Sequence, residues 1–551
     1  MQKSRIKKAF AMIMAIVMIT SASIFTVSAA SPEELGRLPI RATFEEAKAI
    51  VDWCDDERTI HIELMDNIVV LHTRQPLAYV NDEVKALQDD IILWEGRSFI
   101  SPDDLFMILS SMLPVEIEND IDALRSAAIT FMNKFAAGDV SGAVQMMSGE
   151  FQDVLAEMQL FGMEGFEITH IMTWISRGSL IDWEISDYQD IDDSTAFDFT
   201  VNHTIGIGSY RVIVNSDGEI INFIDLGFVF EPIPVAEDAT YTAYPIIVGE
   251  GTPWPLEGLL TMPHEASADN PVPAVVLVHG SEEVNMDGSI FDNRLFHEIA
   301  TYLSSNGIAV IRYHKSIWAH AAIMETYGTN LTIQRESIED ALLAAEILRA
   351  DPRISNIFVI GHSMGGMLAP RIAEEAELDG AILLGAPARA LYKLLYDGNV
   401  QGINAMLSAG QISQDEADEM LAMAASVLEE AQNMPNLTEA ELQEMFIFGF
   451  PAVWLHSFHD ALPLPIISRN IIPTLILHGD GDFQVSTDSE FNLFVEHTEN
   501  YEHVQTILYA GLTHFFTQTQ TEYTYFREYM NPSPVDPQVL RDIVEWIMSN
   551  S

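Results

Sequence analysis

The chain has 551 residues, of which 48% are hydrophobic and 20% charged, and its formal net charge is −55. Single hydrophobic cores stop growing at about 250–300 residues, so this length indicates more than one domain. Nucleic acid is excluded as a partner, because binding to phosphates needs clustered lysines and arginines. The single cysteine, Cys54, cannot form an intramolecular disulfide, so packing must stabilise the fold.

The N-terminal residues have the pattern of a secretory signal peptide. Met1–Lys8 carries four basic side chains, the apolar run Ala9–Thr20 follows, and small residues occupy Val27–Ala30. This pattern predicts cleavage after Ala29 or Ala30, so residues 1–30 should be removed and the protein secreted. An uncleaved membrane anchor is the alternative, because the apolar stretch up to Val27 approaches the length that spans a bilayer.

Residues 36–118 contain two similar segments. The segments Arg37–Ile40 and Arg97–Pro102 each precede an apolar helical pattern, and strand patterns at Thr59–Leu64 and Ile68–Leu71 lie between them. This region resembles the copper amine oxidase N-terminal-like domain, an accessory domain found on many secreted bacterial proteins. The resemblance implies neither copper nor oxidase chemistry, and it suggests association with the cell surface.

Residues 120–234 follow a different pattern. A helix is predicted over Ala123–Ala137, ended by Gly138-Asp139, and strands such as Phe197–Val201 and Tyr210–Val214 come later. Helices followed by a run of strands indicate a small α+β domain, here similar to the cone-shaped domains that often precede bacterial hydrolases. Its expected role is to space or shield the domain that follows.

Beyond the Pro-rich linker Glu231–Val235, residues 238–551 alternate strands with helices. Such alternation predicts an α/β domain with a doubly wound, mainly parallel sheet, whose active residues lie at the C-terminal ends of the strands. Helices are predicted at Asn293–Ser305, Ser337–Ala350 and Met364–Glu375. The predicted strands are Ala274–Val278, Ile308–Tyr313, Ile357–Ile360, Gly380–Leu384, Pro473–Leu477 and Val504–Tyr509.

A Gly-x-Ser-x-Gly motif, Gly361–Gly365, follows one of these strands and opens a helix. The chemistry explains the residue types: Ser363 must sit on a strained turn with its hydroxyl exposed, and the two glycines remove side chains that would collide there. The helix that follows supplies the Met364 N–H and a positive dipole end for a developing oxyanion. The motif therefore predicts Ser363 as a nucleophile.

The other members of a catalytic triad are expected at later strand ends. The strand Pro473–Leu477 leads to Asp480 and Asp482, and we predict Asp482 as the acid and Asp480 as a residue that caps the loop. The strand Val504–Tyr509 delivers His514. In this scheme His514 takes the proton of the serine, and Asp482 fixes the histidine tautomer and stabilises the imidazolium.

The second oxyanion donor is expected after the strand that ends in His279-Gly280. The backbone N–H of Ser281 is the candidate, although this loop departs from the usual glycine-rich form because Glu282 and Glu283 follow. His279 is either a second catalytic histidine or a side chain that shapes the turn, and the second interpretation is favoured.

By these motifs residues 238–551 resemble bacterial α/β-hydrolases of the esterase and dienelactone-hydrolase-like group, which overlaps with serine aminopeptidases. Further matching segments are Arg312–Lys315 and Gly385–Arg389. Where relatives often carry an aspartate this chain has His314, which puts a salt bridge there in doubt. Arg389 either meets an anionic substrate group or forms a structural ion pair.

An insertion over residues 390–465 interrupts the sheet and is predicted to be a helical lid that sets specificity. Helix starts with capping-box spacing occur at Ser413–Glu416 and Thr438–Glu441, and the insertion is rich in Met and Phe. His456 and His459 have a His-x-x-His spacing without an acidic partner, so we predict no metal site. We also predict no cofactor.

Three functions are compatible with these patterns. The first is a carboxylesterase that forms an acyl-enzyme on Ser363, and the second is a serine peptidase acting on short peptides with the same triad. The substrate would be a small acyl ester or a short peptide. The third is a non-catalytic surface-binding protein that uses the hydrolase fold as a scaffold.

Overall fold

The structure is a computed structural model of the chain. It describes residues 121–157, 173, 175–191, 193–320, 322–408, 410–519, 529 and 532–551, together with the backbone of short strands between residues 38 and 100. The predicted signal peptide lies outside these residues. In the part of the chain that is described, no helix is long and apolar enough to cross a membrane.

The N-terminal strands form two antiparallel sheets. In the smaller sheet β1 (Leu38–Pro39) pairs with β8 (Arg97–Ile100), with Leu38 opposite Ile100. The two similar segments, at Arg37–Ile40 and Arg97–Pro102, therefore pair with each other. The helical patterns expected after them lie outside the described residues. The remaining strands are β2 (Ile50–Cys54), β3 (Thr59–Leu64), β4 (Asn67–His72), β5 (Leu77–Val80), β6 (Glu83–Ala86) and β7 (Ile92–Trp94).

Three helices and a four-stranded antiparallel sheet follow. Phe131 and Phe135 on α4 (Ile121–Ala136) pack against Phe223 of the sheet, with ring centroids 5.5 and 5.0 Å apart. The predicted break after α4 is present, because Gly138 has a φ of 71° and Asp139 caps the next helix. The other elements are α5 (Val140–Val144), α6 (Gly149–Glu157), β9 (Leu180–Ile191), β10 (Ser194–His203), β11 (Gly206–Asn215) and β12 (Ile220–Phe230).

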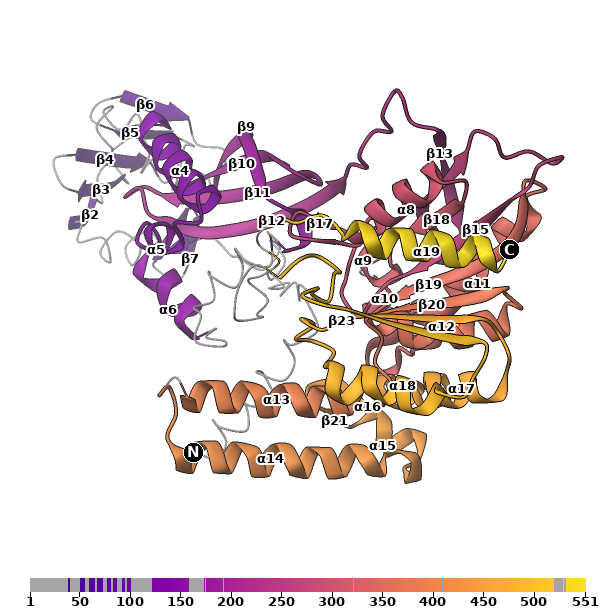
Figure 1. Cartoon of the computed structure of the whole chain (residues 1–551). Helices are drawn as coiled ribbons and strands as arrows, with labels where there is room; N and C mark the ends of the chain where they lie inside the picture. Colours follow the sequence, from indigo (N-terminus) through magenta and orange to yellow (C-terminus); the bar gives the residue numbers. More distant parts are fainter. Residues whose placement is uncertain are drawn as a thin grey trace.

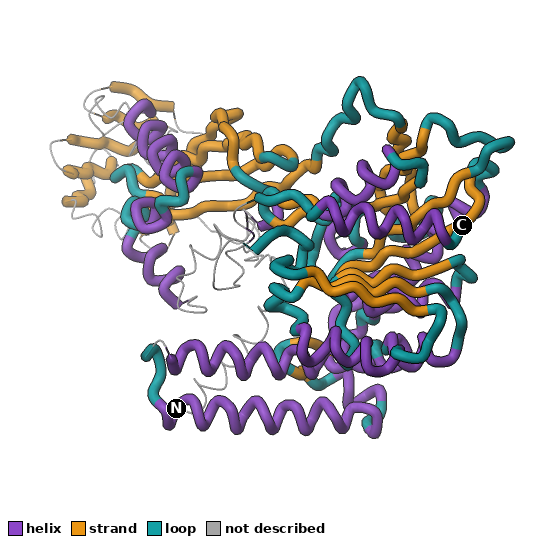
Figure 2. Tube along the Cα trace, viewed as in Figure 1, coloured by secondary structure: helices purple, strands orange, loops and turns teal. Residues whose placement is uncertain are grey.

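An eight-stranded sheet is the centre of the C-terminal half (Figures 1 and 2). Its strand order is β13-β14-β18-β15-β19-β20-β23-β24, and the six strands from β18 to β24 in this order are parallel to one another. All six predicted strands are present: β15 (Val272–Val278), β18 (Ala309–Tyr313), β19 (Ile354–His362), β20 (Gly380–Leu384), β23 (Thr474–Gly479) and β24 (Val504–Tyr509).

The antiparallel edge of this sheet was not predicted. It consists of β13 (Tyr241–Val248) and β14 (Leu256–Pro263), which pair with each other, while β14 also pairs antiparallel to β18. A short loop joins β13 to β14, and Gly249 and Gly251 in that loop have φ values of 69° and 81°. No helix separates the two strands, so the strand–helix alternation that predicted the other six carries no sign of them.

Helices cover both faces of the sheet, which explains why its strands are continuous apolar runs. Every residue of β15 is buried, and alternate side chains serve different cores: Val276 and Val278 face one, Val275 and Leu277 the other. The first core is completed by α11 (Glu339–Ala350) and α12 (Met364–Glu375). The second is completed by α8 (Leu295–Ser305) and α19 (Pro537–Ser549).

The insertion consists mainly of helices, and Figure 1 shows its two longest, α13 and α14, side by side. Both predicted capping boxes form, at Ser413 and Thr438. Phe448 is buried in the core of the sheet domain, whereas Phe446 is 55% exposed. The described α-helices between the sheet strands β20 and β23 are α13 (Leu391–Ser408), α14 (Gln414–Asn433), α15 (Glu439–Gln443), α16 (Ala452–Ser457) and α17 (Pro463–Arg469).

The four-stranded sheet contacts the long loop that follows β15. The carboxylate of Asp292 accepts hydrogen bonds from the Ser179 amide at 2.9 Å and from the Thr204 hydroxyl. The ring of Phe230, the last residue of β12, stands edge-on to His314 with centroids 5.0 Å apart. The loop that carries the predicted oxyanion donor therefore also contacts the region of the four-stranded sheet.

Candidate active site

Ser363 lies on a strained turn between β19 and α12. Its φ and ψ are 54° and −120°, a conformation that side-chain-bearing residues rarely adopt. A Cβ atom on Gly361 would come within 2.0 Å of the Gly365 carbonyl oxygen, and one on Gly365 within 2.2 Å of the Val278 carbonyl oxygen. Both positions therefore require glycine. The Ser363 amide donates to the Leu384 carbonyl at 2.8 Å, which fixes the turn against β20.

The structure brings His514 together with Asp482. The Nδ1 atom of His514 is 2.5 Å from Oδ2 of Asp482, and both residues are buried. The other oxygen of Asp482 accepts two hydrogen bonds of 2.8 Å, from the amides of Gln484 and Val485. These bonds hold the carboxylate in one orientation, so Nδ1 of His514 is kept protonated and Nε2 is left as the acceptor.

Asp480 has a different place. Its side chain is exposed, and its Oδ1 accepts a 2.6 Å hydrogen bond from the Gly511 amide. That bond ties the loop after β23 to the loop after β24, which carries His514. This arrangement is a loop cap and gives Asp480 no contact with the histidine ring among the hydrogen bonds of the described residues.

The pKa values of the pair follow from opposed forces. Burial alone would raise the pKa of Asp482, but the charge of His514 and the hydrogen bond from it bring that pKa below its ordinary value. Burial alone would lower the pKa of His514, and the Asp482 carboxylate outweighs burial and raises it, with a further contribution from Glu282. His514 is therefore a stronger base than a free imidazole, which suits a residue that accepts a proton.

The Nε2 atom of His514 is buried and has no hydrogen-bond partner among the described residues. The neighbour of the serine, His362, donates from Nε2 to the carbonyl of His514 at 3.0 Å, and the two rings are 4.6 Å apart. Burial lowers the pKa of His362 to about 3, so it stays neutral. The variable position of the Gly-x-Ser-x-Gly motif thus anchors the histidine loop, a role that the sequence analysis did not assign.

Gly385, which follows strand β20, lies close to the His514–Asp482 pair. A Cβ atom on Gly385 would lie 3.0 Å from Nδ1 of His514 and 3.4 Å from Oδ2 of Asp482. Gly385 also has a φ of 54°. Because the Ser363 amide is bonded to Leu384, the residue before this glycine, the serine and the histidine–aspartate pair meet at the same strand end.

Both predicted oxyanion donors lie beside the serine. Met364 is the first residue of α12, and Ser281 is buried after β15. A Cβ atom on Gly280 would be 3.3 Å from Cβ of Ser363, which shows how closely this loop approaches. No described residue accepts a hydrogen bond from the Ser281 amide. The two amides could hold an oxyanion formed at Ser363.

Two acidic residues, Glu282 and Glu283, lie in the loop that follows β15 and carries Ser281, which we call the oxyanion loop. The Oε2 atom of Glu282 would be 2.5 Å from a Cβ atom on Gly280, so the carboxylate lies close to the serine. Burial raises the pKa of Glu283 to about 7, while Lys315 lowers it and Glu336 raises it. Glu283 therefore changes charge near neutral pH.

The remaining residues singled out in the sequence have structural contacts. The ring of His279 is buried between Phe296 and Tyr313, with centroids 5.0 and 5.6 Å away, and burial lowers its pKa to about 3. His314 accepts a 3.0 Å hydrogen bond from the Met286 amide through Nδ1. As a neutral acceptor it supports the oxyanion loop without a salt bridge.

Arg389 is engaged by two carboxylates. Its Nε donates to Oε1 of the buried Glu490 at 2.6 Å, and its Nη2 donates to Asp397 at 2.7 Å. The guanidinium therefore has the structural ion pair that the sequence favoured. His456 and His459 stack with ring centroids 6.2 Å apart, and no described cluster of His, Cys, Asp or Glu side chains has the arrangement of a metal site.

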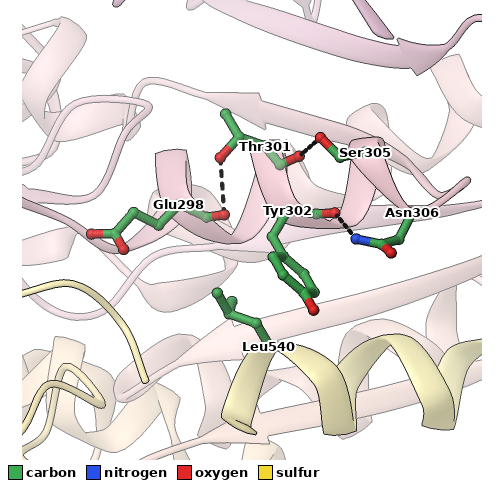
Figure 3. Close-up of a pocket in the computed structure, with 6 residues that line it drawn as sticks. All are labelled: Glu298, Thr301, Tyr302, Ser305, Asn306 and Leu540. Carbon is green, nitrogen blue, oxygen red and sulfur yellow. Dashed lines mark hydrogen bonds between the residues drawn. The ribbon is translucent and has the colours of Figure 1, made fainter. Parts of the chain in front are cut away.

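A hollow of about 400 Å³ lies away from this site, between α8 and α19 (Figure 3). Three of its polar side chains donate to the backbone of α8: Thr301 to the Glu298 carbonyl at 3.1 Å, Ser305 to the Thr301 carbonyl at 2.8 Å, and Asn306 to the Tyr302 carbonyl at 2.8 Å. We interpret it as a groove between two packed helices, because these three donors are directed to the helix backbone.

Comparisons with known proteins find two family matches and a curated relative. Residues 269–518 match the family described as serine aminopeptidase, S33, and residues 23–121 match the copper amine oxidase N-terminal domain. Over 294 residues the chain is 33% identical to Esterase EstD of Thermotoga maritima, which covers 53% of this chain. The chain spans 65% of the length of that esterase.

The comparison with solved structures gives Est1E from Butyrivibrio proteoclasticus, which is 16% identical, has a TM-score of 0.33 and covers 56% of this chain and 98% of its own. An acylaminoacyl peptidase from Pyrococcus horikoshii is 13% identical, has a TM-score of 0.37 and covers 67% of this chain and 56% of its own. The sheet and the family match show an α/β-hydrolase domain, preceded by a copper amine oxidase N-terminal-like domain. Both predicted resemblances are confirmed.

Proposed function

We propose that the chain is a serine hydrolase that cleaves carboxylic esters through an acyl-enzyme on Ser363. The observation that carries the proposal is the buried His514–Asp482 pair, joined by a 2.5 Å hydrogen bond at the strand ends that also hold the strained Ser363 turn. The similarity to serine hydrolase families supports the same reaction class.

The geometry supports the following sequence of steps. Nε2 of His514 removes the hydroxyl proton of Ser363, and Oγ attacks the acyl carbonyl carbon. The oxyanion that forms accepts hydrogen bonds from the amides of Met364 and Ser281. When the tetrahedral intermediate collapses, the bond to the alcohol oxygen breaks and His514 returns the proton to that oxygen. A water molecule, deprotonated by His514, then attacks the acyl carbon. When the bond from that carbon to Oγ breaks, His514 returns the proton to Ser363 and the carboxylic acid leaves.

Replacement of the proposed nucleophile tests this proposal directly. Ser363→Ala should abolish labelling by a fluorophosphonate and lower turnover of p-nitrophenyl esters by about a millionfold, as deletion of a triad nucleophile does elsewhere. Labelling and turnover that survive in a folded Ser363→Ala protein would overturn the proposal. Absence of turnover by the wild-type protein on every ester and anilide would favour the non-catalytic binding function.

A serine aminopeptidase is the second candidate, favoured by the S33 family match over residues 269–518. Ester and amide hydrolysis need the same nucleophile, base and oxyanion donors, so the substrate must decide between them. We propose the ester because the curated relative is an esterase. Comparing p-nitrophenyl acyl esters of graded length with aminoacyl-anilides tests this choice: a higher kcat/KM on the anilides would overturn it.

The proposal includes export of the protein. Its support is the basic and apolar pattern of residues 1–30, followed by small residues at Val27–Ala30. Expression of the full chain in its host should give a mature protein that begins at Ala30 or Ser31. Recovery of an intact N-terminus in the cell interior would contradict it.

A further inference from the structure

Lys315 is a buried lysine that lies two residues after the end of β18 and reaches the oxyanion loop. Its side chain is 2% exposed. The ammonium donates to the Gly280 carbonyl oxygen at 2.8 Å and forms a 2.7 Å ion pair with Oε1 of Glu336. The backbone amide of Lys315 is also 3.3 Å from the Val284 carbonyl oxygen. Two segments of the oxyanion loop are thus held by one residue.

The Gly280 carbonyl belongs to the same peptide unit as the N–H of Ser281. Because a peptide unit is planar and trans, fixing the direction of its C=O fixes the opposite direction of its N–H. A charged donor on the carbonyl oxygen also polarises the amide, and hydrogen bonds strengthen each other in such chains. The peptide that Lys315 holds therefore carries the N–H expected to bind the oxyanion.

We propose that Lys315 is a positioning residue for the oxyanion hole: it clamps the Gly280–Ser281 peptide and aims its N–H at the position where the oxyanion of an acyl-Ser363 intermediate forms. This inference rests on the proposed function. Lys315 acts through the peptide rather than on substrate. The effect should be larger in the transition state than in the ground state, since charge on the acyl oxygen develops only there.

The clamp extends to the insertion. Glu336 lies in a π-helical turn, Gln334–Ile338, and is 3% exposed. Its second carboxylate oxygen accepts a 2.5 Å hydrogen bond from Nε1 of Trp454 on α16. A buried ammonium requires such a partner, because an unpaired charge in the interior is strongly destabilising. The insertion thus contacts the oxyanion loop through the series Trp454, Glu336, Lys315.

The test compares wild-type protein with the double variant Lys315→Met, Glu336→Gln, which removes both charges of the buried ion pair together. Folding is checked by circular dichroism and thermal melting. On a p-nitrophenyl ester we expect kcat to fall on the order of 10–100-fold, because loss of a whole oxyanion donor costs about 10²–10³-fold. The KM should change less than about threefold, and affinity for a boronic acid that forms a tetrahedral adduct on Ser363 should fall in parallel with kcat/KM.

A merely structural role would lower the melting temperature and leave kcat and boronic acid affinity unchanged in the folded protein, and that result would overturn the proposal. If the double variant does not fold, Glu336→Gln alone is the deciding variant. It keeps the shape of the side chain and weakens the hold on Lys315, so kcat should fall several-fold at unchanged KM. Wild-type kcat in a folded Glu336→Gln protein would equally overturn the clamp.

The link to the insertion has its own matched pair. Trp454→Phe removes the Nε1 donor to Glu336 and should lower kcat several-fold, whereas Trp546→Phe on α19, in the other core, should not change it. Equal kcat for both variants would remove Trp454 from the clamp. Failure of the proposed function is distinguishable, because it would show as turnover that survives in the Ser363→Ala protein, and that result would overturn the role of Lys315 as well.

Discussion

Asp480 and Asp482 are two residues apart in the chain, yet the structure gives them different tasks. Asp482→Asn should keep the serine but favour the wrong tautomer of His514, so we expect kcat to fall about ten-thousandfold while weak fluorophosphonate labelling survives. Asp480→Asn is the control, because the Asp480 side chain accepts its hydrogen bond from the Gly511 amide at an exposed loop and does not contact His514 among the hydrogen bonds of the described residues. Steady-state kinetics on one ester decides, and a crippled Asp480→Asn beside a mild Asp482→Asn would reverse the assignment.

The pH profile should report the charge around His514. Catalysis needs neutral His514, so activity is lost as the pH falls through its pKa. The Asp482 carboxylate, aided by Glu282, raises that pKa above the ordinary 6.5, and the acid limb of kcat/KM should therefore lie above pH 6.5. Glu282→Gln removes a negative charge and should move this limb to lower pH. An acid limb that stays in place in the Glu282→Gln protein would show that Glu282 does not act on the histidine.

At the scale of single elements, local patterns predict the sheet domain well. The strands β20 and β24 and the helix α12 have the predicted bounds, because the hydrophobic pattern of each segment is local in the sequence. Both capping boxes are also present, since they depend on residues only three apart. What local pattern misses is the edge pair β13 and β14, which has no helix between its strands.

The contacts of the site divide in the same way. Ser363 and His514 can be predicted from the sequence because the strand-to-helix turn and the strand end are local features. The pairing of His362 with the His514 carbonyl joins residues 152 positions apart, and that of Lys315 with the Gly280 carbonyl joins residues 35 apart. Such bonds depend on strand order in the sheet, which the sequence does not state. The sequence therefore predicts the reacting groups and not the groups that hold them.

Two phenylalanines of the insertion separate its packing role from its proposed role in specificity. Phe448 is 2% exposed in the core, so Phe448→Ala should lower the free energy of unfolding by about 3–5 kcal/mol. Phe446 is 55% exposed, so Phe446→Ala should cost little stability and change the preference among p-nitrophenyl esters of graded chain length. Thermal melts and the ester series measure both. An unaltered preference in the Phe446→Ala protein would mean that this face of the insertion does not meet the acyl chain.

At the scale of the whole molecule, the four-stranded sheet and the hydrolase domain share the loop after β15. Asp292 accepts hydrogen bonds from Ser179 and Thr204, and the Phe291 amide donates to the Ile175 carbonyl at 3.0 Å. These contacts fall on the side of the loop beyond Ser281. They should stabilise the loop without taking part in catalysis, because the proposed catalytic residues all come after the exposed linker at residues 231–235.

A truncated chain that begins at Pro234 should therefore fold and keep most turnover on small esters, but it should melt at a lower temperature than the full chain. The loss comes from the contacts that Phe291 and Asp292 make with the residues before the linker. In the full chain Asp292→Ala should lower the melting temperature in the same direction while kcat stays within about twofold. Scanning calorimetry and ester kinetics on the three proteins make the comparison. Complete inactivity of a soluble, folded truncated chain would mean that the preceding sheet is needed to shape the oxyanion loop and is more than its support.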